Sequence, residues 1–157
     1  MNTTQLQVLK AAILADSNLT DLVAQFATVA IKNYLQGDST FIVWKTLVTR
    51  REILQNGFDW TRLDNLAVGP ARIWSDIFVD GYLNPSKPNV RAGIEAVWKG
   101  PAPDLAVRAA IYVRCKRPAS IAEKLFATGV GTDAEPGLLT LEGIPTEYDV
   151  VQALSQV

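Results

Sequence analysis

Histidine is absent from the chain, and cysteine occurs only once, at Cys115. Histidine is the usual general base, the commonest metal ligand and the partner of Ser or Cys nucleophiles, so its absence argues against these kinds of catalytic site. A lone cysteine excludes an intrachain disulfide and fits a reducing cytoplasm. We therefore expect a protein that is not an enzyme, with no cofactor, metal site or small-molecule substrate.

The chain also lacks an excess of either charge and any long apolar run. Fifteen Lys and Arg residues stand against sixteen Asp and Glu residues, which gives a formal net charge of −1. This balance provides no overall field that would attract nucleic acid or an anionic membrane, although local patches remain. The opening sequence MNTTQLQVLK does not follow the pattern of a secretory signal, and no apolar run approaches the roughly 18 residues of a membrane helix. We expect a protein that is not secreted and has no membrane contact.

Apolar residues are abundant enough to form a folded core. The chain has 157 residues, of which 48% are hydrophobic and 20% are charged. This length and balance predict a single domain over residues 1–157, built around one core. The stretch 58–100 holds three of the four tryptophans and should supply much of that core. Trp74 and Trp98, which lie in helical phase, are expected inside it.

Apolar residues recur at helical spacing along most of the chain, which predicts a mainly α fold: a helical bundle of about six to eight helices. Thr3 or Thr4 should cap a first helix that ends near Ala15, and Asp16 should open a second helical segment that ends near Gln36. Thr49 and Glu52 have the spacing of a capping box, which predicts a short helix over residues 50–55 that Asn56-Gly57 ends. Asp59 should cap a turn that runs to Leu66. Three further helices are expected: one from Pro70 to Asp80 with Ile73, Trp74, Ile77 and Phe78 inward, one capped by Ser86, and one capped by Thr146.

Extended structure should be minor. The segment Phe41–Val48 is rich in β-branched and aromatic residues, and at most a small β element is expected from residues near 40–48 and 138–142. A longer helix should open near Pro103, carry Leu105, Ala109 and Tyr112, and kink or break at Pro118, because proline has no amide to donate. A second capping box, Ser120 with Glu123, predicts that the helix restarts there. Residues 129–137 are expected to form a loop.

Three features are candidates for chemistry, and each has a simpler explanation. Asp76 and Asp80 are four residues apart, but such a pair on an amphipathic helix is usually its solvated side. Gly129-Val-Gly131 lacks the third glycine and the strand-to-helix setting of a phosphate-binding loop. Cys115 lies among cations that could lower its pKa, yet without a histidine or second cysteine a quiet, partly buried thiol is the favoured interpretation.

Basic and aromatic residues are the candidates for partner contacts. The larger basic group lies on the predicted kinked helix and comprises Arg108, Arg114, Lys116, Arg117 and Lys124; we expect Arg114, Arg117 and Lys124 on one side of it. Tryptophan is enriched at protein interfaces, and Trp44 and Trp60, outside helical phase, are candidate anchors. We predict an interface that consists of Trp44, Lys45, Arg50, Arg51, Arg114 and Arg117.

Several segments together carry a family resemblance. They are LKAAILAD (9–16), VWKTLVTRREI (43–53), FDW (58–60), LNPSKPNVRAGI (83–94), CKRPASIAEKLFATG (115–129) and the closing LEG and DVVQAL. In this order they resemble a family of small helical proteins encoded among the structural genes of tailed bacteriophages. Members of the family carry leucine where this chain has Pro118, so the resemblance alone would imply a straighter helix there.

The resemblance implies a non-enzymatic virion or assembly protein, located in the virion after assembly in the host cytoplasm. Small helical phage proteins of this kind are typical of head-to-tail adaptors, so the implied role is a homo-oligomeric ring at the neck that contacts the portal and tail proteins and passes close to packaged DNA. Two alternatives remain open: a capsid decoration or tail structural protein, and a small nucleic-acid-binding regulator that uses the basic group at 108–124.

Overall fold

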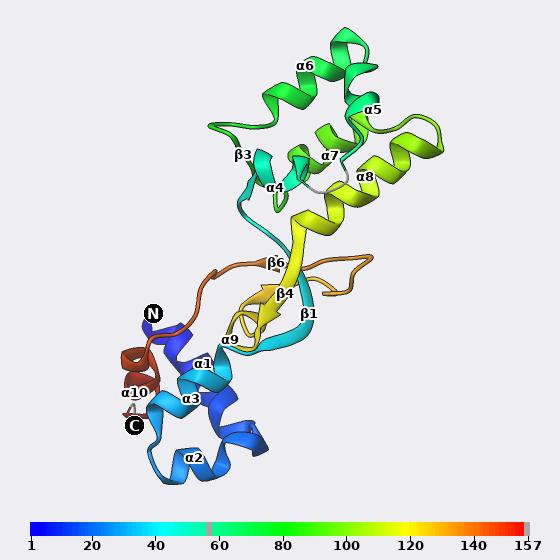
Figure 1. The fold of residues 1–157 in the computed structure, drawn as a ribbon. Helices are drawn as coiled ribbons and strands as arrows, with labels where there is room; N and C mark the ends of the chain where they lie inside the picture. Colours follow the sequence, from blue (N-terminus) through cyan, green and yellow to red (C-terminus); the bar gives the residue numbers. More distant parts are fainter. Residues whose placement is uncertain (56–57, 156–157) are drawn as a thin grey trace. The chain divides into compact units, whose positions relative to one another are not determined.

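The computed structural model describes residues 1–55 and 58–155 (Figure 1). It is 56% helical, with ten α-helices and a few short strands among the described residues. The prediction of a mainly α protein is confirmed. The helix count exceeds the six to eight expected, because the segment from Asp16 to Gln36 is divided and the turn expected after Asp59 is a short helix.

The chain forms two compact units. Unit 1 consists of residues 1–43 and 118–157, and unit 2 of residues 44–117. Each unit buries its own set of apolar side chains. The expectation of one core is therefore wrong, whereas the assignment of residues 1–157 to a single domain stays a prediction.

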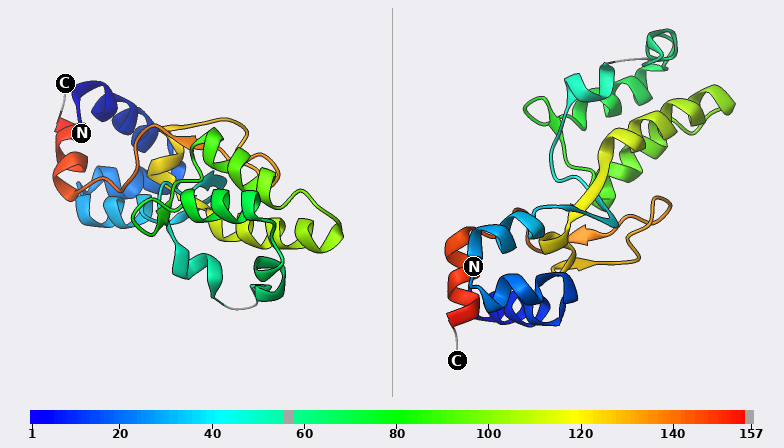
Figure 2. Two further views of the ribbon diagram at one scale, coloured as in Figure 1. Left: turned by 90° about the horizontal axis from the view of Figure 1, so that it is seen from above. Right: turned by 60° about the horizontal axis from the view of Figure 1, so that its bottom comes forward.

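Unit 1 is built mainly from helices contributed by both ends of the chain. Its elements are α1 (Thr3–Ala15), the 3₁₀ helix η1 (Ser17–Leu19), α2 (Thr20–Ala24), α3 (Thr28–Leu35), most of β1 (Asp38–Trp44) and of β4 (Lys116–Ser120), α9 (Ile121–Lys124), β5 (Ala127–Thr128), β6 (Leu138–Leu139) and α10 (Glu147–Ser155). In Figure 2, α10 lies beside α1 and α3. Leu9, Ile13, Ile31 and Val150 are fully buried where these helices meet.

The helical segment expected from Asp16 to Gln36 is interrupted. Asp16 does accept a hydrogen bond from the amide of Asn18, at 2.9 Å, as a cap should. Phe26, however, has a φ of 51°, which lies in the left-handed region and ends α2. The amide of Ala27 then bonds the carbonyl of Leu22, at 2.8 Å, and α3 starts at Thr28. The first helix also differs in its cap, which is Asn2 rather than Thr3 or Thr4.

The small β elements pair differently from the expectation. Strand β1 pairs with β4, and β6 pairs with β5, so residues 138–142 are not the main partner of residues 40–48. The predicted break near Pro118 is confirmed: the preceding helix ends at Cys115, the strand β4 follows, and a helix restarts at Ile121, as expected. A strand at this place tolerates Pro118, which has no amide to donate. The Ser120–Glu123 capping box is confirmed, with amide contacts of 2.9 and 3.1 Å.

The loop between β5 and β6 is anchored to β1. The amide of Ile42 bonds the carbonyl of Gly131, and the carbonyl of Ile42 accepts from the amide of Gly137, each at 2.8 Å. The ring of Phe41 occupies the space where side chains at both glycines would lie. The glycines are therefore required by close packing, and the predicted loop is confirmed.

Unit 2 holds the tryptophan-rich core. Its elements are β2 (Val48–Thr49), α4 (Arg50–Leu54), α5 (Trp60–Asp64), α6 (Val68–Asp76), β3 (Tyr82–Leu83), α7 (Pro88–Val97) and α8 (Ala102–Cys115). Strands β2 and β3 are antiparallel. The Thr49–Glu52 capping box is confirmed. The predicted helix end at Asn56-Gly57 lies outside the described residues, and α7 begins after Lys87 instead of the expected cap Ser86.

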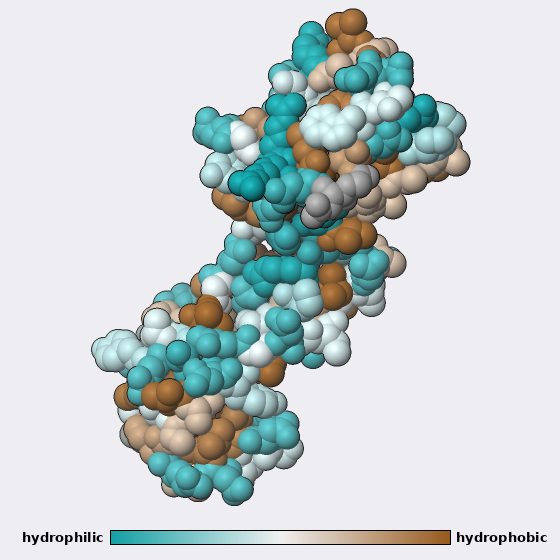
Figure 3. Space-filling view, viewed as in Figure 1, coloured by the Kyte–Doolittle hydropathy of each residue, from teal (hydrophilic) through white to brown (hydrophobic). Residues whose placement is uncertain are grey.

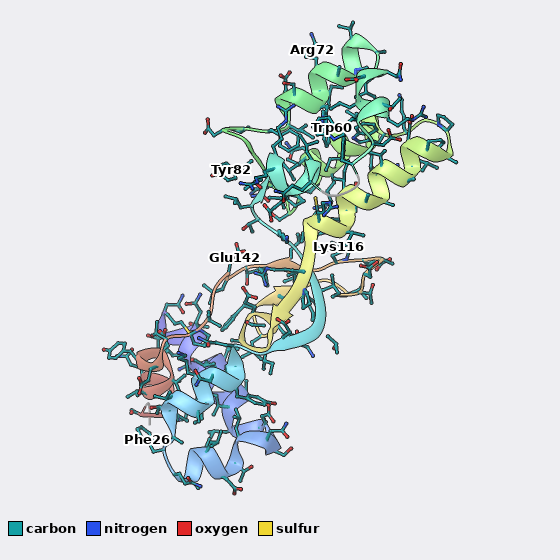
Figure 4. The ribbon with its side chains drawn as sticks, viewed as in Figure 1. Phe26, Trp60, Arg72, Tyr82, Lys116 and Glu142 are labelled. Atoms are coloured by element: carbon teal, nitrogen blue, oxygen red, sulfur yellow. The ribbon has the colours of Figure 1, made fainter. Side chains whose placement is uncertain are left out.

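Aromatic rings fill the centre of unit 2. The ring of Trp74 lies 5.4 Å from that of Trp98 and 5.0 Å from that of Phe78, edge to face in both pairs. Phe58 packs against both tryptophans. The prediction that Trp74 and Trp98 are core residues is confirmed, whereas Ile73 is exposed and its inward placement is wrong. The side chains in both units are shown in Figure 4.

Candidate assembly surface

The six predicted interface residues all lie in unit 2, but they do not all reach the surface. Trp44 is only 8% exposed. Its ring meets Tyr112 edge to face at 5.2 Å, and the guanidinium of Arg91 lies 5.1 Å from its centre on one face. The expectation of an exposed Trp44 is wrong, because these neighbours cover it. Trp60 is the exposed tryptophan, at 54%.

Lys45, Arg50 and Arg51 come together around α4. The Lys45 ammonium lies 3.6 Å from the carboxylate of Glu52. The Thr49 amide and hydroxyl, followed by Lys45, hold the pKa of Glu52 below its usual value. Arg50 lies 5.5 Å from the ring centre of Phe78, and both Arg50 and Arg51 are exposed on the first turn of the helix. The two arginines are therefore available to a partner.

The larger basic group does not form one helical face. Arg114 is in the last turn of α8, Arg117 is in β4, and Lys124 is in α9, which belongs to unit 1. Their predicted alignment is wrong because the helix ends at Cys115. Arg114 and Arg117 are half-buried.

The remaining chemical candidates also have structural explanations. Cys115 is fully buried, and burial raises the pKa of its thiol to about 12, against the smaller opposing effects of Lys45 and Lys116. Asp76 ends α6, while Asp80 lies beyond the helix at a φ of 52°, so the two do not share a helical face. Within residues 1–55 and 58–155, no group of three or more Cys, Asp or Glu side chains is placed to hold a metal ion. No helix in that part of the chain combines the length and the apolar character needed to cross a membrane.

The most distinctive surface is the solvent side of α8. The inner side of this helix is formed by Val107, Ile111 and Cys115, which are buried at a spacing of four residues. The outer side consists of Ala102, Leu105, Ala106, Ala109, Ala110 and Val113, all exposed. We call these six residues the α8 face. At 100° per residue they span about 140° of the helix without a polar side chain.

Charged residues border the α8 face. Arg108 lies one helical turn after Leu105 and Arg114 directly follows Val113, so each arginine lies toward one edge of the face. Both are half-buried. A hollow of about 250 Å³ adjoins it, lined by Phe58, Asp59, Pro103, Ala106, Val107 and Ala110. In Figure 3, the edge of unit 2 formed by α8 carries tan and brown, the colours of apolar residues.

The sequence interpretation missed this face because it assigned the wrong phase to the helix. Leu105 and Ala109 were expected to contribute to the apolar core side, yet Leu105 is 42% exposed and Ala109 is exposed as well. The larger residues Val107, Ile111 and Cys115 were the available signal, since they recur every four positions among alanines. Of the expected apolar set only Tyr112 is half-buried, with its hydroxyl 3.0 Å from Glu95. Burial, followed by Glu95, raises its pKa.

Comparison of the chain with models of known families, with curated protein sequences and with solved structures finds no match.

Proposed function

We propose that this chain is a non-enzymatic structural subunit of a tailed-phage virion that works by assembling with further copies of itself. The observation that carries the proposal is the α8 face. A helix exposed over about 140° without a polar side chain is unusual for a chain that stays alone in water, and is typical of helices that pack against a partner. Its small side chains would let another backbone approach closely.

The α8 face needs additional surface to make a stable contact. Fourteen helical residues extend about 21 Å, so a stripe about 10 Å wide offers only about 200 Å². A specific interface buries about 800 Å² on each partner. The exposed cations Arg50 and Arg51, together with Lys45, Arg114 and Arg117, are the proposed polar surroundings of this centre. Trp44 would act indirectly, by supporting Tyr112 and the end of the helix.

Within this class we propose a head-to-tail adaptor, a ring of copies on the portal that contacts tail proteins. The support for this finer role is the resemblance to phage structural proteins, and the role implies location in the virion. A capsid decoration or tail structural protein is the alternative within the class. We also propose that residues 1–157 work as one helical bundle domain. This is supported by the chain passing between the two units twice, at 43–44 and at 117–118.

A second candidate function is a small nucleic-acid-binding regulator. Unit 2 contains twelve Lys and Arg residues against seven Asp and Glu residues, a formal charge of +5. Such a cluster could neutralise phosphates, and binding would then weaken steeply with salt. A fluorescence titration with a short DNA duplex at about 50 mM salt tests it, because phosphate-driven binding is strongest at low salt. Absence of binding there would remove this candidate.

The experiment that tests the assembly proposal is the native mass of the purified protein, alone and mixed with the portal ring of the same phage. We expect a discrete multimer or a discrete ring bound to the portal. Ala109→Arg places a charge in the centre of the α8 face and should abolish assembly. Ala96→Arg, at an exposed alanine of α7 in the same unit, is the matched control and should assemble normally. If both variants assemble like the original chain, the α8 face is not the contact; a protein that stays monomeric and ignores the portal would contradict the assembly function itself.

A further inference from the structure

The nearly neutral chain conceals two units of opposite charge. Unit 1 contains three Lys residues against nine Asp and Glu residues, a formal charge of −6. Unit 2, with its charge of +5, nearly cancels this. The partition is not visible along the sequence, because unit 1 is assembled from the two ends of the chain.

Part of each charge is free for an outside partner. In unit 1, the carboxylates of Asp21, Asp38 and Glu135 are exposed and make no hydrogen bond or ion pair with the described residues. In unit 2, the same holds, within the described part of the chain, for the cations Arg51, Arg72 and Lys99; Arg72 lies on α6 in Figure 4. Charges that are not neutralised inside their own unit favour an oppositely charged surface.

Unit 1 also offers an apolar surface that could receive the α8 face. At the corner between α2 and α3, Phe26 and Val29 are 53% and 52% exposed. The left-handed backbone at Phe26, rare for a bulky residue, holds this ring at the corner. Glu147 lies beside it, since its carboxylate accepts a hydrogen bond from Thr28 at 3.0 Å. The corner is therefore apolar with the carboxylate of Glu147 beside it, whereas the α8 face is bordered by Arg108 and Arg114, with Asp59 in the adjoining hollow.

We propose that copies of this chain associate head to tail, with basic unit 2 of one copy against acidic unit 1 of the next. The α8 face then meets the corner formed by Phe26 and Val29. A symmetric contact between two copies of unit 2 would bring two charges of +5 together and is disfavoured. A nucleic acid complements the charge of unit 2 alone, whereas a second copy complements both units. The contact leaves one acidic and one basic unit unused at the ends, so it continues into a ring or a filament.

The proposal rests on the assembly function and adds the orientation of neighbouring copies. Two triple variants test it. The first, Arg51→Glu, Arg72→Glu and Lys99→Glu, changes the formal charge of unit 2 from +5 to −1. The second, Asp21→Lys, Asp38→Lys and Glu135→Lys, changes that of unit 1 from −6 to 0. All six positions are exposed, and circular dichroism would check that both variants fold.

Sedimentation velocity at physiological salt should show each variant alone as a monomer and their equimolar mixture as a one-to-one complex. The mixture pairs the unchanged unit 1 of the first variant with the unchanged unit 2 of the second, and growth stops there. The charge-conserving control, Arg51→Lys, Arg72→Lys and Lys99→Arg, should assemble like the original chain. Raising salt from about 50 to about 500 mM should weaken assembly of the original chain at least about tenfold, because the contact charges are screened.

Several results would overturn the orientation while leaving assembly intact. One such result is that each triple variant assembles by itself, as the original chain does. Another is that the equimolar mixture of the two variants remains monomeric. The first variant could still assemble but no longer bind a DNA duplex that the original chain binds. That result would assign the basic unit to nucleic acid instead. An original chain that stays monomeric at every concentration would overturn both the orientation and the assembly function.

Discussion

Replacing Gly137 with alanine tests whether the loop between β5 and β6 is built around the ring of Phe41. A Cβ atom at residue 137 would overlap the ring and lie 2.6 Å from the carbonyl oxygen of Thr128. That oxygen belongs to β5, and in the pairing of β5 with β6 Thr128 lies opposite Leu138, the residue directly after Gly137. Neither neighbour can move without breaking contacts of its own, so we expect the free energy of unfolding to fall by about 1–3 kcal/mol.

Two other glycines separate the overlap from backbone effects. Gly143 has a φ of 109° and open space around its Cβ position, so Gly143→Ala should destabilise by about 1–2 kcal/mol through backbone strain alone. Gly69 lies inside α6, also with open space and without a left-handed φ. Gly69→Ala should therefore change the free energy of unfolding by no more than about 0.5 kcal/mol, because the gain in helix propensity is offset by contact of the new Cβ with the ring of Pro70.

Urea unfolding followed by two signals would measure these changes. All four tryptophans lie in unit 2, so their fluorescence reports on that unit, whereas far-ultraviolet circular dichroism reports on the helices of both. If residues 1–157 unfold as one domain, Gly137→Ala in unit 1 should lower both midpoints together. A Gly137→Ala variant as stable as the original chain would refute the packing argument. A shift in circular dichroism without a shift in fluorescence would refute the single domain.

Two further predictions concern groups that are buried or capped. Since the pKa of the Cys115 thiol is raised to about 12 in the folded chain, its contribution to stability is complete below the ordinary pKa near 9 and is lost as pH rises toward 12. Between pH 9 and 10.5, the free energy of unfolding of the original chain, measured with urea, should fall by about 2 kcal/mol more than that of the Cys115→Ala variant. Equal losses in the two proteins would contradict the buried-thiol explanation. Thr49→Ala should cost about 1 kcal/mol by removing an N-cap, and Ser120→Ala should cost more, about 2 kcal/mol, because its partner Glu123 is buried. Thermal unfolding of the two variants side by side would compare the two losses of stability. A larger loss for Thr49→Ala than for Ser120→Ala would contradict the prediction.

Local sequence patterns located most helix starts correctly. Thr49 with Glu52 and Ser120 with Glu123 form the expected capping boxes, and Asp59 caps α5 by accepting from the amide of Arg62 at 3.1 Å. These patterns succeed because both partners lie within one helical turn, so no distant part of the chain is needed to define them.

The candidate surfaces depended on contacts that local patterns do not contain. The sequence indicated Arg50 and Arg51 as exposed cations, but it placed Trp44 at the surface and assigned the wrong phase to α8. Apolar residues occur on both sides of that helix, with Leu105 and Val113 outside and Val107 and Ile111 inside, so their spacing alone does not assign the buried side and packing in unit 2 decides it. Trp44 is buried by Tyr112, which lies 68 positions away in the sequence.

The sequence by itself determined a mainly helical chain, with its caps, its proline break at Pro118 and its buried pair Trp74 and Trp98. These follow from propensity and periodicity, which act over a few residues. Only the tertiary structure decided that β1 pairs with β4, that Phe26 interrupts a helix, and that the two ends of the chain form one acidic unit. The strand pairing and the acidic unit result from contacts between distant segments, which no short stretch of sequence encodes.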